Sequence, residues 1–444
     1  MKKMVASSYT EAFSREWVKE HIKDSSNELV IFRQLIPWQR IINQLVQFYS
    51  EGKGRFAKPL RIMVAIIVVG RLRLLSDAQI ISQVKENRYL QYFCNVPDEG
   101  LQTFLNPSSL TIFRERLGTK GAAIIEEEVF QNLRRAGVIE NDAQLIDSTV
   151  MEDNIIYPTD VLLLYKVFGK MRQFAERNNI PPWWDEQYLK KRWRAYSLAK
   201  KNEKVDFLLE FYLLFIMGLG IFRIHMESCE LSDKQCEKGR ILLDLLSLLE
   251  DQTQQKLSGE KHIENRIVSL DEVDARPIKK GKSYPPCEFG TTLQTSFNRQ
   301  GFMVTTENFI GQPGDKTLYP STLELYRERM KKYPEIAITD LGYRSLSNLK
   351  AGKGKVQHVF MGRSEDVPEE KQDYCRRARA ATEGFIAVAK NWRGFGRSLY
   401  RRFDGDKIWT SLCQIAYNLK KFLQLYQKEK IKEDSLAKLG LLPA

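Results

Sequence analysis

The chain has 444 residues, of which 43% are hydrophobic, so it can form two to four domains or one core with a large insertion. Its formal net charge of +13 favours a polyanionic partner, either nucleic acid or an anionic membrane surface. The six cysteines include no C-x-x-C pair and the chain has only four histidines, which argues against a zinc finger or a disulfide framework. We therefore expect reduced thiols and a cytoplasmic protein.

The first 139 residues predict a mostly helical region. The opening stretch lacks the apolar core of a signal peptide. Residues 59–75 are apolar with arginines near both ends, and Ser76 and Asp77 are typical of the start of the next helix. Further helices follow a turn-rich loop and reach Arg135. Helix faces that carry arginines can lie on DNA or can simply be solvated.

A strand and a long helical stretch follow. Residues 143–156 are rich in β-branched side chains and predict a strand. Residues 158–265 predict helices, with Trp183 and Trp184 as core or dimer contacts. The most apolar run, residues 211–222, is shorter than the roughly 20 residues that span a bilayer. We expect a buried helix there and no membrane contact.

Strands return in the last third of the chain. Residues 264–270 predict a strand, residues 274–287 a basic loop, and residues 288–311 a hairpin that turns at 298–301. Pro313-Gly314-Asp315 is typical first of a turn and a helix cap, although Asp315 could also serve as a fourth acid beside Asp147, Asp340 and Glu383. The remaining predicted elements are a helix at 317–334, strands at 334–345 and 356–362, and helices at 368–392 and 408–430.

Three acidic residues stand out by their context. Asp147 follows an apolar pair within a strand, and Asp340 ends another apolar strand. A carboxylate there is costly unless it is solvated, paired or bound to a metal. Glu383 lies on a predicted helix, and Arg379 and Lys390 share about one face with it. Taken singly, each acid is explained by a solvated strand end or a surface ion pair. Together, and in this order, they suggest one metal-binding active site.

In this order the motifs resemble those of the DDE transposases of bacterial insertion sequences, over roughly residues 30–425. The segments that carry the resemblance are Asp147-Ser148-Thr149 with 157–160, residues 274–282 with 288–290, and Asp340-Leu341-Gly342-Tyr343 as the D-x-G-Y motif. Arg379-x3-Glu383-x6-Lys390 matches the R-(3)-E-(6)-K part of the family's Y-(2)-R-(3)-E-(6)-K signature. The signature's tyrosine position holds Arg376, and Tyr374 is two residues away. That departure leaves the tyrosine's phosphate contact without a clear counterpart.

The resemblance implies an α/β fold. It consists of a ribonuclease-H-like mixed sheet flanked by helices, an N-terminal helical domain and a helical insertion after the first core strand. The corresponding division is a DNA-recognition domain at 1–139, the first part of the core at 140–157, the insertion at 158–265, the remainder of the catalytic core at 266–430 and a tail at 431–444.

The resemblance also implies a chemistry. A transposase cuts the ends of its element and joins them to target DNA by phosphodiester transfer, using two Mg²⁺ or Mn²⁺ ions held by carboxylates. On this basis Asp147 bridges both ions, Asp340 holds one and Glu383 the other. No covalent protein–DNA intermediate is needed. The implied partners are double-stranded DNA, as terminal inverted repeats and target, and further copies of the chain in a homodimer or higher synaptic oligomer. The implied location is the nucleoid in the bacterial cytoplasm.

Basic residues predict where DNA is bound. Residues 371–430 contain seven Lys and seven Arg against five Asp and Glu. Within 391–403, arginines alternate with aromatic residues that can stack on unpaired bases or pack into the core. The predicted DNA contacts are Arg376, Arg379, Lys390, Arg393, Arg397, Arg401, Arg402, Lys279, Lys280 and Lys282.

Two other functions fit part of the pattern. A catalytically silent, transposase-derived DNA-binding regulator would keep the basic surface, but the intact acidic trio argues against it. A stand-alone nuclease of the ribonuclease H type would keep the acids. The long helical N-terminus and the basic C-terminal segment argue instead for recognition of specific DNA ends.

Overall fold

The computed structural model describes residues 10–50, 56–98, 105–181, 183–200, 202–279 and 287–441. The chain divides into two compact units. The first, here called the core unit, comprises 1–152, 292–309 and 313–444. The second, called the insertion unit, comprises 153–291 and 310–312. The predicted DNA contacts Lys280 and Lys282 lie outside the described residues.

The N-terminal part of the core unit is helical, as the sequence predicts. Ser76 begins α5 with a capping box, in which its side chain and that of Gln79 bond each other's backbone N–H. Gly118 breaks the helical backbone inside α7 with φ 57°. The helices are α1 (Arg15–His21), α2 (Glu28–Leu35), α3 (Trp38–Leu45), η1 (Val46–Phe48), α4 (Leu60–Leu72), α5 (Asp77–Glu86), α6 (Arg88–Cys94) and α7 (Pro107–Arg135).

Several arginines of these helices are structural. The guanidinium of Arg61 lies 3.3 Å from the ring centre of Trp38, and that of Arg71 lies 3.9 Å from the ring centre of Trp409. Both side chains are buried. Arg114 donates two hydrogen bonds, of 2.9 and 2.7 Å, to the carboxylate of Asp77. These three arginines therefore stabilise the helical packing through cation–π contacts and a bidentate ion pair.

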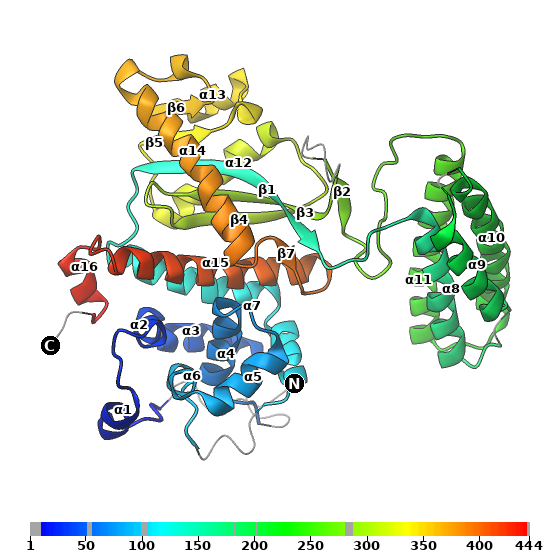
Figure 1. Ribbon diagram of the computed structural model, residues 1–444, viewed down its shortest axis with the longest axis horizontal. Helices are drawn as coiled ribbons and strands as arrows, with labels where there is room; N and C mark the ends of the chain where they lie inside the picture. Colours follow the sequence, from blue (N-terminus) through cyan, green and yellow to red (C-terminus); the bar gives the residue numbers. More distant parts are fainter. Residues whose placement is uncertain are drawn as a thin grey trace. The chain divides into compact units, whose positions relative to one another are not determined.

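One open mixed sheet forms the centre of the core unit (Figure 1). Strand β1 pairs in parallel with β5, and β5 in parallel with β6. Strands β3 and β4 form the predicted antiparallel hairpin, and β7 pairs with β1. The strands are β1 (Ala143–Asp153), β3 (Glu288–Phe297), β4 (Met303–Ile310), β5 (Ile336–Thr339), β6 (His358–Met361) and β7 (Arg397–Ser398). The expectation of an α/β protein with a mixed sheet and a helical N-terminal region is confirmed.

Alternate side chains of the strands enter two different cores. Leu145 and Ile338 pack with residues of α14 (Glu369–Trp392) and α15 (Arg402–Tyr426) on one face. Ile146 and Ala337 pack on the other face with residues of α12 (Asp315–Met330). This is the period of two that a strand imposes on its side chains. The short elements η3 (Leu341–Tyr343), α13 (Leu346–Gly352), η4 (Ser364–Asp366) and α16 (Glu433–Lys438) complete the unit.

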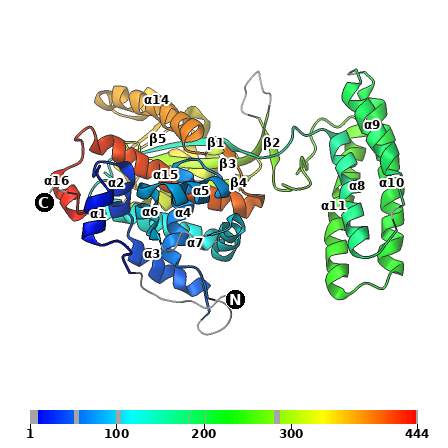
Figure 2. The same ribbon diagram turned by 60° about the horizontal axis from the view of Figure 1, so that its bottom comes forward.

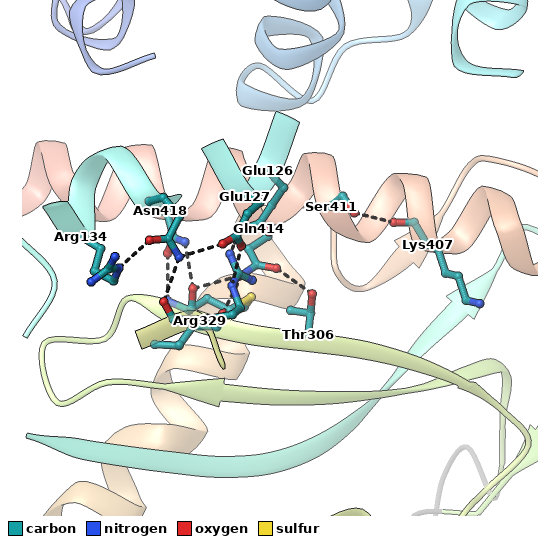
Figure 3. Close-up of polar contacts among 12 residues, drawn as sticks. Glu126, Glu127, Arg134, Thr306, Arg329, Lys407, Ser411, Gln414 and Asn418 are labelled. Atoms are coloured by element: carbon teal, nitrogen blue, oxygen red, sulfur yellow. Dashed lines mark hydrogen bonds and ion pairs between the residues drawn. The ribbon is translucent and has the colours of Figure 1, made fainter. Parts of the chain in front are cut away.

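A polar seam attaches α15 to strand β4 (Figure 3). The side-chain amide of Asn418 accepts from the backbone N–H of Met303 and donates to its carbonyl, both at 2.9 Å. Thr306 donates to Gln414 at 2.7 Å. On the neighbouring helices, Arg329 pairs with the buried Glu126 at 2.8 Å. Burial raises the pKa of Glu126, and Arg329 opposes that rise. These side chains of α15 satisfy backbone N–H and carbonyl groups on the open edge of β4. That edge could otherwise pair with another strand.

The described residues of the insertion unit form four helices. These helices lie side by side in both views (Figures 1 and 2). They share one hydrophobic core, into which Trp183 and Trp184 pack. Trp183 also donates to the carbonyl of Gly218 at 3.1 Å. Both tryptophans therefore act as core contacts within this unit. The helices are α8 (Asp160–Arg177), α9 (Glu186–Leu198), α10 (Lys204–Ser228) and α11 (Asp233–Leu257).

Two local predictions for this unit are wrong. Residues 264–270, all of them described, form no strand. There the backbone N–H and carbonyl of Ile267 bond the side chain of Gln252, which replaces a strand partner. The start of the predicted basic loop instead forms β2 (Arg276–Ile278), which pairs antiparallel with residues 288–290.

Helix α10 also differs from its prediction. It extends over 25 residues, well beyond the apolar run at 211–222, and only one of its faces is buried. By length and composition alone it is apolar enough to cross a membrane, and 28% of its most apolar window is buried within the structure. The expectation of a buried helix is therefore met on one face only, because Phe211, Phe215 and Phe222 are buried while side chains such as Leu213 and Met217 lie exposed.

Candidate active site

Asp147 lies on the central strand β1. The parallel register pairs Ala143 with Ile336 and Leu145 with Ile338, and its continuation places Asp147 opposite Asp340. Asp147 lies two residues after Leu145 on the same strand, so both side chains point to the same face of the sheet. Helix α14 covers that face. Its Oδ1 accepts from the backbone N–H of Ser148 at 2.8 Å, and its side chain is 15% exposed. The carboxylate is thus held at a fixed place on the sheet.

Asp340 follows the last residue of β5 and caps η3. Its Oδ1 accepts from the backbone N–H of Gly342 at 3.0 Å. Gly362, just after β6, has φ 76°, and a Cβ there would stand 2.8 Å from the backbone nitrogen of Leu341. Only glycine fits this close approach. The turn that carries Asp340 is therefore supported from the neighbouring strand.

Glu383 lies on α14, one helical turn after Arg379. The guanidinium of Arg379 contacts all three predicted acids. Its Nη2 lies 3.4 Å from Asp147 and 3.8 Å from Asp340, and its Nη1 lies 3.3 Å from Glu383. The three acids are thus gathered around one cation that is only 20% exposed. Glu383 is the outermost of them, with 71% of its side chain exposed.

The donor chemistry of this cluster suits a hard divalent cation, since all three acids offer carboxylate oxygens. In this structure the guanidinium of Arg379 lies among them. Within the described ranges, no group of three or more His, Cys, Asp or Glu side chains is arranged to hold one metal ion. Coordination by the trio therefore requires the guanidinium to leave and Glu383 to turn inward.

A fourth acid lies beside the trio. Asp315 is the first residue of α12, and its Oδ1 accepts a 2.8 Å hydrogen bond from the hydroxyl of Ser148. A Cβ on Gly342 would stand 3.1 Å from both Asp315 Oδ2 and Asp340 Oδ1. The N-cap of α12 is Gly314, so Asp315 is not the cap of this helix. Its carboxylate bonds Ser148 instead. The sequence signal was Pro-Gly-Asp, which a turn explains equally well.

Tyr343 and Gln294 lie next to the acidic cluster. Tyr343 is buried and donates to Gln294 at 2.8 Å. Burial raises the pKa of the Tyr343 hydroxyl, and the negative charges of Asp315 and Asp147 raise it further. Tyr343 is therefore a neutral hydrogen-bonding group beneath the acids.

The predicted DNA contacts on α14 differ in exposure. Arg376 has 61% of its side chain exposed and lies 4.0 Å from Asp373. Lys390 is half-buried and has a polar or charged partner. Arg393, just beyond the helix, donates to the carbonyl of Trp392 at 2.6 Å, and burial lowers its pKa. Arg376 is thus the most accessible cation of the three.

The basic segment at 391–403 separates into surface and core positions. Arg401 and Arg402 are exposed, as is Arg397, which pairs with Glu152. Of the aromatic residues proposed to stack on bases, Trp392 is 63% exposed. In contrast, Phe395 is buried, and Tyr400 packs against Trp409 and Arg114. At Phe395 and Tyr400, the alternation of basic and aromatic residues therefore reflects packing of the aromatic side chains.

Tyr374 and Lys279 are the remaining described residues of the predicted motifs. Tyr374 packs against the core beside the sheet, with Arg299 5.4 Å from its ring centre, and burial raises its pKa to about 12. Lys279 is exposed, and its backbone bonds the side-chain amide of Gln312 within the insertion unit.

Comparison with known proteins adds a family signal to this geometry. Residues 17–116 match the family model described as "Transposase domain (DUF772)". The chain is also similar to the "Uncharacterized protein ORF8 in nfe locus" of Rhizobium meliloti, with 26% identity over 155 residues, or 34% of this chain and 74% of that protein. No solved structure matches the chain. Both matches support a transposase family and a transposition-related function, and the family match suggests a nuclease or transferase kind of activity.

Proposed function

We propose that this protein is a DNA transposase that cuts the ends of an insertion sequence and joins them to target DNA. The observation that carries the proposal is the convergence of Asp147, Asp340 and Glu383 on one guanidinium, from two parallel strands and the helix that covers them. The match of the N-terminal helices to a transposase domain supports the same function. The site would operate in the bacterial cytoplasm, on a ribonuclease-H-like sheet.

Each acid has its own part in the proposal. Asp147 would help to hold the Mg²⁺ or Mn²⁺ ions, because it is the least exposed of the three acids and is fixed by the N–H of Ser148. Asp340 would hold one ion and Glu383 the other. The bound ions would activate the attacking oxygen and stabilise the leaving oxygen of the phosphodiester. Ser148 would keep Asp315 hydrogen-bonded beside the site.

Arg379 would exchange partners when DNA binds. In this structure its guanidinium neutralises the acids. A scissile phosphate offers two oxygens that can accept a bidentate pair of hydrogen bonds from the same planar guanidinium. Arg379 would therefore move from the acids to the phosphate as cations enter. The flanking backbone would be held by the exposed Arg376, Arg401 and Arg402, by Arg397, Arg393, Lys390 and Lys279, and by Lys280 and Lys282 outside the described residues.

A second function is favoured by one observation. With Arg379 in their midst, the acids are not spaced to hold a metal ion. A catalytically silent DNA-binding regulator would retain this arrangement permanently. The two functions differ in whether Arg379 leaves the acids when DNA and divalent cations are added.

A cleavage assay separates the two functions. The full chain is incubated with Mg²⁺ or Mn²⁺ and DNA that carries the terminal sequences flanking its own gene, and strand nicks are mapped on a denaturing gel. We expect nicks at the element ends with the wild type, no nicks with Asp340→Ala, and equal DNA binding by both proteins. The matched control is Asp373→Ala, which removes an exposed acid on α14 and should cut normally. Binding of end DNA by the wild type without cleavage under either metal would favour the regulator.

A further inference from the structure

Helix α10 of the insertion unit carries an apolar stripe on its outer face. Val205, Leu209, Leu213, Met217 and Ile224 are between 47% and 67% exposed. Their spacing of mostly four residues places them on one side of the helix, over a length of roughly 30 Å. The opposite side of α10 packs into the core of the bundle. Apolar side chains on one contiguous face in water are typical of an interaction surface. We call this set, together with Gly220, the α10 stripe.

Gly220 lies within the stripe. An added Cβ there would meet no atom within 4 Å, so the space outside it is open. A glycine in a helix interior costs about 1 kcal/mol relative to alanine. It gives a second helix room to approach closely at this point.

The charges at the ends of α10 indicate the direction of a partner helix. Asp206 lies in its first turn, and Arg223 lies near its end. A second copy of α10 in antiparallel orientation brings Asp206 of each copy to Arg223 of the other. A parallel copy would place like charges together.

The stripe itself is also self-complementary when reversed. An antiparallel pair centred between Leu214 and Phe215 places Val205 opposite Ile224 and Leu209 opposite Gly220, and Leu213 and Met217 of the two copies meet near the centre. The same register brings Asp206 of one copy close to Arg223 of the other. Arg223 is 47% exposed and already pairs with Glu250 at 3.1 Å, so its guanidinium stays in place for a second carboxylate. Such a twofold pairing is an isologous contact, in which one surface binds itself.

We infer that the α10 stripe is a homodimer interface, in which α10 packs antiparallel against α10 of a second copy. A membrane is the competing occupant, because α10 is long and apolar enough to span one. Insertion would have to remove Phe211, Phe215 and Phe222 from the core of the bundle. It would also carry Glu210, which pairs with Arg192, into lipid. The inference is independent of the proposed DNA chemistry.

Sedimentation of the full chain without DNA tests the interface. We expect the wild type to form dimers, and Leu213→Glu to weaken the dimer by at least about tenfold, because it places two charges at the centre of an apolar contact. Gly220→Leu should also weaken the dimer, since it keeps the stripe apolar but blocks close approach. The control Leu248→Glu changes an equally exposed residue of α11 outside the stripe and should leave the dimer intact. Circular dichroism checks that each variant is folded.

Two results would overturn the inference. One is a wild type that stays monomeric, or a Leu213→Glu variant as dimeric as the wild type. The other is flotation of the wild type and Gly220→Leu alike with vesicles of phosphatidylethanolamine and phosphatidylglycerol, which would assign the stripe to a membrane. DNA cleavage is not part of the readout, so failure of this inference leaves the proposed function standing.

Discussion

Arg379 Nη2 lies 3.4 Å from Oδ2 of Asp147, and this ion pair joins helix α14 to the central strand of the sheet. The same guanidinium reaches Asp340 and Glu383. Two half-buried aspartates on adjacent strands repel each other unless a cation lies between them. Arg379 supplies that cation in this structure, so its charge should be exchangeable for that of a divalent ion.

Replacing Arg379 should make the fold depend on divalent cations. We expect Arg379→Gln to lower the melting temperature in a chelating buffer by about 2–4 °C, which corresponds to about 1 kcal/mol. Mg²⁺ should then raise the melting temperature of the variant more than that of the wild type. Thermal unfolding with and without Mg²⁺ measures both effects. Arg377→Gln is the control, because Arg377 pairs with the exposed Asp373 on the same helix and not with the three acids.

Gly362 should be needed for the position of Asp340. Gly362→Ala combines a left-handed backbone with a Cβ 2.8 Å from the nitrogen of Leu341, and should cost about 1–3 kcal/mol and reduce cleavage. The control Gly354→Ala has a similar φ of 89° but no atom within 4 Å of its new Cβ. Denaturant unfolding and the nicking assay compare them. Equal losses in both variants would mean that contact with the Asp340 turn is irrelevant.

Asn418 should stabilise the edge of the sheet. Asn418→Leu leaves the buried N–H of Met303 without its side-chain partner, while the carbonyl keeps a 3.2 Å hydrogen bond from Gln414, so the loss should be about 1–3 kcal/mol for one unsatisfied group. Urea unfolding measures the loss. Gln424→Leu, at an exposed position on the same helix, should change the free energy of unfolding by less than about 0.5 kcal/mol.

The exposed arginines after α14 should contribute to DNA affinity through charge. We expect Arg401→Gln to weaken binding to all DNA sequences alike and to reduce the slope of log affinity against log salt by about one. Fluorescence anisotropy at several salt concentrations provides the slope. Arg327→Gln is the control, because that exposed arginine pairs with Glu324 on α12 and is not among the predicted contacts. An unchanged slope for Arg401→Gln would remove this residue from the DNA surface.

Local sequence patterns predicted most elements of the core unit. The hairpin, the strand before Asp340 and the helix of Glu383 were expected because each carries a clear period, turn or cap. Residues 264–270 had the composition of a strand, but the side chain of Gln252 satisfies their backbone. Strand β2 was missed because its three residues lie among lysines and prolines.

The candidate site was predictable in part. The sequence singled out the three acids but not the guanidinium among them, since Arg379 was expected on the DNA surface and on the same helix face as Glu383. Asp315 lies near Asp340 because of the tertiary fold, which the spacing of residues along the sequence does not reveal. Burial of Phe395 and Tyr400 was equally hidden, because interleaved aromatic and basic residues occur both on DNA surfaces and at the edge of a core.

The most direct test of the central claim, that the three acids form one metal site, is a Mn²⁺ titration followed by electron paramagnetic resonance in the presence of end DNA. The wild type should bind two ions. Asp147→Asn, which removes the acid that the family resemblance implies as the bridge, should lose both ions, while Asp340→Asn and Glu383→Gln should each lose at least one. The control Asp373→Asn should bind as the wild type does. Retention of both ions by Asp147→Asn would contradict the account.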